Sequence, residues 1–110
     1  MYVDLIEKAA QELPLTAIIT PWTEYAWKYE DFPEILRYFK NQGWIVLGGD
    51  ILTLELTHTL DNWYYNPESS LSEEENVLLS CEAAERYLRN YRNRKGSDYY
   101  IVFVVTRRSP

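Results

Sequence analysis

The segment WIVLGGDILTLELT, residues 44–57, decides the fold, because its branched and aromatic side chains predict β-structure. Glycine weakens the interior of a strand, so Gly48-Gly49 indicates a bulge, a sharp bend or a close approach of another backbone. We therefore expect two strands, over about residues 44–48 and 51–58, or one strand interrupted at the pair. Gly48 and Gly49 are assigned a structural role. Asp50 after them is expected to form a turn, with an interface charge as the alternative.

Two later segments also have strand character. Residues 60–65 contain Trp63, Tyr64 and Tyr65, which favour a short strand, while Asp61-Asn62 offers a turn. Residues 99–106, with the sequence YYIVFVVT, form the most apolar segment of the chain. Such a segment is typical of a strand that is buried on both faces, so we expect it to lie centrally in the sheet.

Apolar residues at spacings of three and four predict three helices. The first covers residues 2–13 and ends at Pro14, the second runs from Asp31, with Glu34 completing a capping box, to Gly43, and the third covers about residues 80–95 and ends at Gly96. Residues 20–29 fit either a helix or an alternating strand, and we favour a helix or an irregular turn. Residues 66–75 are expected to form a polar, acidic loop.

The size and composition predict one domain over residues 1–110. The chain has a mass of 13.1 kDa, and 46% of its residues are hydrophobic and 25% charged, which is typical of a soluble domain with its own core. We predict an α+β fold with a mainly antiparallel sheet of about four strands and about three helices packed on one face.

Cofactors and membranes are not expected. Cys81 is the single cysteine and His58 the single histidine, which excludes an internal disulfide and a zinc cluster of Cys and His residues. No apolar run approaches the ~20 residues needed to span a bilayer, and residues 1–4 lack the order of a signal peptide. We therefore expect a cytoplasmic protein without a metal or a cofactor.

Charge is distributed unevenly along the chain, whose formal net charge is −6. Sixteen acidic and four basic residues lie within residues 1–85, whereas residues 86–110 hold seven basic residues and one acid, Asp98. A mostly acidic surface disfavours nucleic acid as a partner and favours a basic protein. Ten Tyr and four Trp exceed what one small core takes up, so some of these aromatic side chains should be exposed.

Two features invite other functions. Cys81 lies in the first turn of the third predicted helix, where the helix dipole would lower its pKa. A small enzyme could use Cys81 with His58, or else the carboxylates of the Gly48–Asp50 bend. Residues 86–95, with the sequence RYLRNYRNRK, could bind nucleic acid. Packing explains the cysteine better, and helical pairing with Glu82 and Glu85 explains the basic run better. We predict that the protein is not an enzyme and keep both functions as alternatives.

Acidic and aromatic side chains gather within residues 61–75, a combination typical of protein-binding surfaces. A solvated loop over buried aromatic side chains is the equally open alternative. The candidate contact residues are Asp61, Trp63, Tyr64, Glu68, Glu73, Glu74 and Glu75, with Asp50 and Glu55 as weaker candidates.

The order of several short motifs resembles the immunity proteins of bacterial polymorphic-toxin and contact-dependent growth inhibition systems, and within them immunity family forty. The resemblance covers about residues 26–105. It is carried by Ala26-Trp27, the helix over 32–39, Val46-Leu-Gly-Gly-Asp-Ile-Leu52, Asp61-Asn-Trp-Tyr64, a helix with Ala83, Ala84 and Tyr87, and the strand over 100–105. The first 25 residues match no motif of the family, so we assign them no role.

The resemblance implies a small cytoplasmic α+β protein that binds the C-terminal domain of a cognate toxin and blocks it without catalysis. Such toxins are often nucleases, which are commonly basic, so an acidic inhibitor suits them. The candidate contact residues named above are accordingly expected to bind the toxin. Neither the identity of the toxin nor the oligomeric state of the protein follows from the resemblance.

Overall fold

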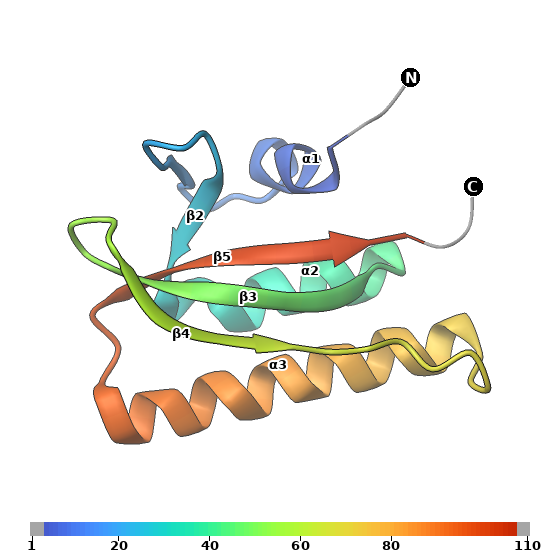
Figure 1. Cartoon of the computed structure of the whole chain (residues 1–110). Helices are drawn as coiled ribbons and strands as arrows, with labels where there is room; N and C mark the ends of the chain where they lie inside the picture. The colour runs from blue at the N-terminus through green and yellow to red at the C-terminus, as the bar shows by residue number, and fades with distance from the viewer. Residues whose placement is uncertain (1–3, 108–110) are drawn as a thin grey trace.

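The computed structural model describes residues 4–107, which form an α+β fold with a five-stranded sheet where about four strands were expected (Figure 1). The elements in chain order are α1 (Leu5–Glu12), β1 (Ile18–Ile19), β2 (Tyr25–Lys28), the 3₁₀-helix η1 (Tyr29–Asp31), α2 (Phe32–Gln42), β3 (Ile45–Thr53), β4 (His58–Tyr64), α3 (Glu73–Lys95) and β5 (Tyr99–Thr106).

The sheet has the strand order β1-β2-β5-β3-β4, and every neighbouring pair is antiparallel. β5 has the bounds that its sequence predicts and lies between β2 and β3, which confirms its central position. Ile101 and Phe103 are buried because helices cover their side of this strand.

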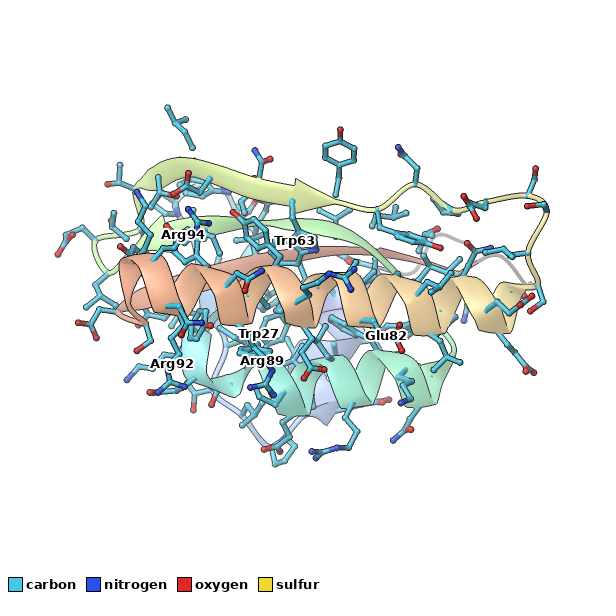
Figure 2. The ribbon with its side chains drawn as sticks, turned by 90° about the horizontal axis from the view of Figure 1, so that it is seen from below. Trp27, Trp63, Glu82, Arg89, Arg92 and Arg94 are labelled. Atoms are coloured by element: carbon cyan, nitrogen blue, oxygen red, sulfur yellow. The ribbon has the colours of Figure 1, made fainter. Side chains whose placement is uncertain are left out.

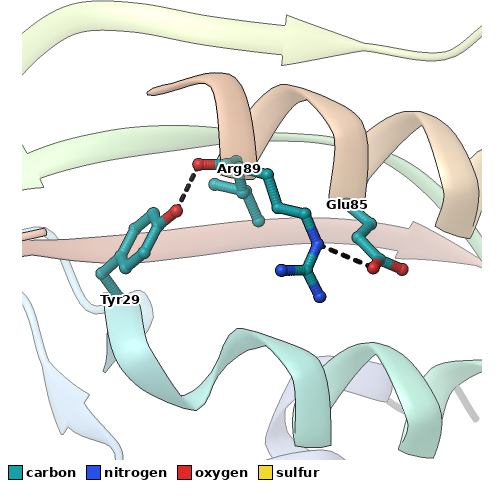
Figure 3. A network of polar contacts seen from close by, with 4 residues as sticks. Tyr29, Glu85 and Arg89 are labelled. Carbon is teal, nitrogen blue, oxygen red and sulfur yellow. Dashed lines mark hydrogen bonds and ion pairs between the residues drawn. The ribbon is translucent and has the colours of Figure 1, made fainter. Parts of the chain in front are cut away.

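Helices α2 and α3 lie on one side of the sheet, and α1 packs beside β2 and β5 (Figure 1). The main core joins Trp27, Phe39 and Phe103, and α1 contributes Ala9 to it. Tyr29 in η1 donates a hydrogen bond to the carbonyl of Leu88 in α3, so the chain entering α2 is fixed to α3 (Figure 3).

The glycine pair lies inside one strand, β3, whose register shifts between Val46 and Gly48. One strand forms instead of two, and it continues through both glycines, which pair with β4 and β5; the expected irregularity is the register shift just before them. A Cβ on Gly48, whose φ is 153°, would overlap the carbonyl oxygen of Trp63. A Cβ on Gly49 would lie 2.5 Å from Cη2 of Trp63, so this glycine leaves room for the indole.

Residues 20–29 differ from the expected helix or irregular turn, since Tyr25–Lys28 form β2. Pairing with β1 on one side and β5 on the other outweighs the helical spacing of the aromatic residues. Helix α2 forms as predicted and ends at Gly43 in a left-handed conformation, but the side chain of Asp31 makes no capping hydrogen bond. Asp61-Asn62 lies within β4 and forms no turn.

Helix α3 begins at Glu73, seven residues before the predicted start at Ser80. Ser72 and Glu75 form a capping box that fixes this start. The three glutamates expected in a loop therefore form the first turn of α3, and Cys81 lies well inside the helix. Helix α1 lies within the predicted residues 2–13, of which residues 2 and 3 fall outside the described part of the chain.

Candidate functional site

The sheet has two unlike faces, because side chains alternate between them along each strand. Helices α2 and α3 cover one face. We call the opposite side the outer face; no helix lies over its β3 and β4 strands (Figure 1). The pairing register places on it Lys28 of β2, Tyr100, Val102 and Val104 of β5, Asp50 and Leu52 of β3, and His58, Asn62 and Tyr64 of β4.

One half of the outer face is closed by the chain itself. Ala26, Leu52 and Val102 form a small second core, on which Ile18, Leu56 and Tyr100 pack. The turn between β1 and β2 reaches across to β4, where Trp22 stacks on His58 with ring centroids 4.7 Å apart. This half is therefore shielded by residues 18–26 and the β3–β4 turn.

The other half of the outer face is open. Val104 is 45% exposed and Tyr64 75% exposed, and both pair with Gly48, which has no side chain to fill the space between them. Asp50 and Asn62 form the next cross-strand pair. We call these five residues, Gly48, Asp50, Asn62, Tyr64 and Val104, the open strip.

A cavity of about 200 Å³ adjoins the open strip at β5. Val102 and Val104 line it together with Thr23, Glu24 and Asp4. Asp4 caps α1 by accepting a hydrogen bond of 3.0 Å from the backbone of Ile6, and Glu24 accepts one of 2.5 Å from the indole of Trp22. Two carboxylates with fixed positions therefore stand at this end of the strip.

Positive charge is concentrated on the two helices of the covered face. Of the ten Lys and Arg within residues 4–107, seven lie on α2 and α3, namely Arg37, Lys40, Arg86, Arg89, Arg92, Arg94 and Lys95. Lys8, one of the other three, lies 3.7 Å from Glu12. Figure 2 shows Arg92 and Arg94 near the end of α3 and Glu82 nearer its start, so this helix runs from an acidic to a basic end.

The pairing expected for the basic run is formed in part. Nε of Arg89 lies 2.8 Å from a carboxylate oxygen of Glu85 (Figure 3). Glu82 and Arg86 form no ion pair, although both belong to the described residues. Arg86 therefore stays available to a partner or to solvent.

The structure separates the predicted contact residues around β4. Asp50 and Tyr64 lie in the open strip, and Glu55 is exposed in the β3–β4 turn. Asp61 faces α3 and accepts a hydrogen bond of 2.9 Å from Tyr91, and burial together with this bond raises the pKa of Tyr91.

Trp63 also faces α3 and belongs to the core. It is 8% exposed and stacks on Tyr87, with ring centroids 5.2 Å apart. Figure 2 shows it between β4 and α3. A partner on the molecular surface therefore has little access to its indole.

The remaining predicted residues lie where β4 connects to α3. The buried side chain of Asn76 accepts hydrogen bonds from the Tyr65 hydroxyl at 2.6 Å and the Glu68 backbone at 2.9 Å, which holds the connection in place. Glu73, Glu74 and Glu75 form the first turn of α3. Hydrogen bonds from Ser72, first from its backbone and then from its side chain, lower the pKa of Glu75.

Three surface residues of the candidate site, Val104, Asn62 and Glu24, were not predicted from the sequence. Val104 lies in the segment YYIVFVVT, where apolar residues occupy both faces and no alternation reveals the outer one. Glu24 belongs to the turn before β2, which was expected to be helical or irregular. An alternating strand pattern at Tyr25, Trp27 and Tyr29 was the available signal.

The structure does not bring together the groups of the catalytic alternative. Cys81 is 7% exposed, its thiol faces the carbonyl of Leu36 in α2, and burial raises its pKa. His58 lies on the outer face, across the sheet from Cys81. Within residues 4–107 there is no group of three His, Cys, Asp or Glu side chains that could hold a metal ion, and no helix long and apolar enough to cross a membrane.

Comparison with known proteins gives one family. A family model described as Immunity protein 40 matches residues 14–105, which is most of the chain and includes every strand except the last residue of β5. No curated protein and no solved structure matches the chain.

Proposed function

The chain belongs to the Immunity protein 40 family, and on this premise we propose that it neutralises a bacterial toxin by binding the toxin's C-terminal domain in a one-to-one complex that occludes its active region. The proposed toxin is a basic, nuclease-type domain of a polymorphic-toxin or contact-dependent growth inhibition system. The protein acts in the cytoplasm, where such a toxin would reach its substrate.

The family match over residues 14–105 is the observation that carries this proposal. The surface supports it independently, because exposed Tyr64 and the acidic residues around it provide aromatic contact area and a negative field. An interface of ordinary size would bury ~1,600 Å² in total. It would draw on Asp50, Glu55, Tyr64, Glu68 and the glutamates of the first α3 turn.

The proposal is tested by co-expressing this chain with the toxin domain encoded beside its gene. We expect the two to co-purify at one to one and the chain to restore growth of cells that produce the toxin. A matched control expresses the same toxin with this chain carrying a stop codon early in β3. No complex and no rescue would exclude the immunity function.

Nucleic-acid binding is retained as a second candidate because Arg86 lacks the expected ion pair and adds to the basic end of α3. Such binding should weaken steeply with salt. Retention on RNA or DNA at 50 mM salt, and its loss when Arg86, Arg92 and Arg94 are replaced by Gln, would support this function. The wild-type chain passing through the same columns unretained would exclude it.

A further inference from the structure

We propose that the open strip of the outer face is the surface on which the basic toxin domain docks. This inference rests on the proposed function and deepens it, because it locates the interface. It places the toxin over β5, β3 and β4, beside the acidic first turn of α3 and away from α2 and the rest of α3.

The strip exposes apolar and aromatic area. Tyr64 at 75% and Val104 at 45% exposure lie on either side of Gly48, on neighbouring strands of one rigid sheet. Large aromatic side chains on a rigid framework provide binding energy at a low entropic cost. The strip therefore has the anchor groups that a protein interface needs.

The shape of the strip also suits a docking surface. Gly48 is held against the backbone of Trp63 and cannot carry a side chain, so the floor between Tyr64 and Val104 stays flat. The cavity beside Val104 continues this floor past the edge of β5. Gly48 itself is buried, so the strip presents the exposed side chains of Tyr64 and Val104 to a partner with no β3 side chain projecting between them.

Charge complementarity favours a basic partner. Asp50 lies in the strip, and Asp4 and Glu24 stand at the adjoining cavity. Among the β2–β5 residues that the pairing register places on the outer face, Lys28 is the one lysine or arginine. The seven cations of α2 and α3 lie on the covered side of the sheet. The same helices also carry six glutamates, so the helical side is close to neutral overall. The acidic groups beside the strip therefore favour a basic toxin on the outer face.

The chain path strengthens this charge argument. The acidic first turn of α3 follows the carboxyl end of β4, where Tyr64 lies, and the basic last turn precedes Tyr99 at the start of β5. Val104 is near the far end of β5. The open half of the outer face therefore lies toward the acidic end of α3, and the closed half toward its basic end (Figure 1).

Two matched substitutions test the location. Val104→Arg and Leu78→Arg each place an arginine at an aliphatic position that is 45% exposed, the first in the open strip and the second on α3. Tyr64→Ala removes the proposed aromatic anchor and is tolerated by the fold because Tyr64 is mostly exposed. Circular dichroism and thermal unfolding establish that each variant is folded.

Binding is measured by biolayer interferometry with the toxin domain, separated from the co-purified complex under denaturing conditions and refolded. We expect Val104→Arg and Tyr64→Ala each to weaken binding by about 30-fold or more, the effect of losing a central anchor, and Leu78→Arg by less than about 3-fold. Unchanged binding by folded Tyr64→Ala, or a loss confined to Leu78→Arg, would overturn the docking surface while leaving the immunity function intact. Failure of the wild-type chain to bind the toxin would instead overturn the proposed function.

Discussion

The indole of Trp63 lies over Gly49 and contacts Phe103, so a side chain at position 49 would collide with it. The ring centroids of Trp63 and Phe103 lie 5.9 Å apart in an edge-to-face arrangement, and Gly49 is paired with both residues on neighbouring strands. The second glycine of the Leu-Gly-Gly-Asp motif thus makes room for the tryptophan of the Asn-Trp-Tyr motif. Sequence positions 49 and 63 are coupled through one ring.

Gly49→Ala should therefore destabilise the fold by about 1–3 kcal/mol, the usual effect of overpacking a core. A Cβ would lie 2.5 Å from Cη2 of Trp63 and 2.6 Å from the carbonyl oxygen of Val102. Urea unfolding measures the change. In a Trp63→Leu background the same substitution should cost less, because the ring is gone. Equal effects in the two backgrounds would contradict the coupling.

Cys81 offers a second prediction at the residue scale. Its thiol is buried between α3 and α2 and its pKa is raised by burial, so the reactive thiolate is scarce in the folded chain. Iodoacetamide at pH 8 should label the native protein far more slowly than the protein in 6 M guanidinium chloride, as mass spectrometry would show. Equally fast labelling in both conditions would restore the thiol as a candidate nucleophile.

At the scale of elements, the start of α3 depends on Ser72. Its hydroxyl accepts the backbone N–H of Glu75 at 3.1 Å, and Glu75 accepts the backbone N–H of Ser72 at 2.9 Å. Ser72→Ala should destabilise the protein by about 1 kcal/mol, measured by thermal unfolding. Ser70→Ala, outside the capping box, is the matched control and should leave the unfolding midpoint nearly unchanged.

The capping box also makes a pH prediction. Because the folded state lowers the pKa of Glu75 below the ordinary value of 4.5, its ionised carboxylate stabilises the fold above that value. This contribution is lost as the pH falls through the lowered pKa. The stability difference between wild type and Glu75→Ala should therefore shrink on acidification, and a difference that grows instead would contradict the assigned role.

The elements differ in how far the sequence could predict them. The pattern Ser72-Glu-Glu-Glu75 is a capping box that precedes Val77, so the start of α3 was available from the sequence and was missed. β5 was predicted with its bounds. Which of its faces is exposed could not be predicted, because the residues of YYIVFVVT are apolar on both faces of the strand. The spacing of the aromatic residues within 20–29 fits a strand as well as a helix, so the local pattern could not decide β2; its long-range pairing with β1 and β5 does.

On the scale of the whole molecule, α3 acts as a long electrostatic dipole. Its 23 residues extend ~35 Å, while the longest extent of the molecule is 38 Å. Glu73, Glu74 and Glu75 lie at its start and Arg92, Arg94 and Lys95 at its end, an order that also complements the helix macrodipole. An approaching charged protein therefore meets a negative and a positive end, and its orientation is selected before contact.

This dipole predicts opposite kinetic effects at its two ends. Replacing Glu73, Glu74 and Glu75 by Gln keeps a side chain that can form the capping box and removes three negative charges, so association with a basic toxin should slow several-fold at low salt. Replacing Arg92, Arg94 and Lys95 by Gln should accelerate it. Stopped-flow fluorescence at 20 mM and 1 M salt separates long-range steering from direct contacts. At 1 M salt the Debye length is only ~3 Å, so the association rates of the two variants and the wild type should converge. The toxin would not be steered by α3 if both variants associated as fast as the wild type at low salt, or if both association rates changed in the same direction.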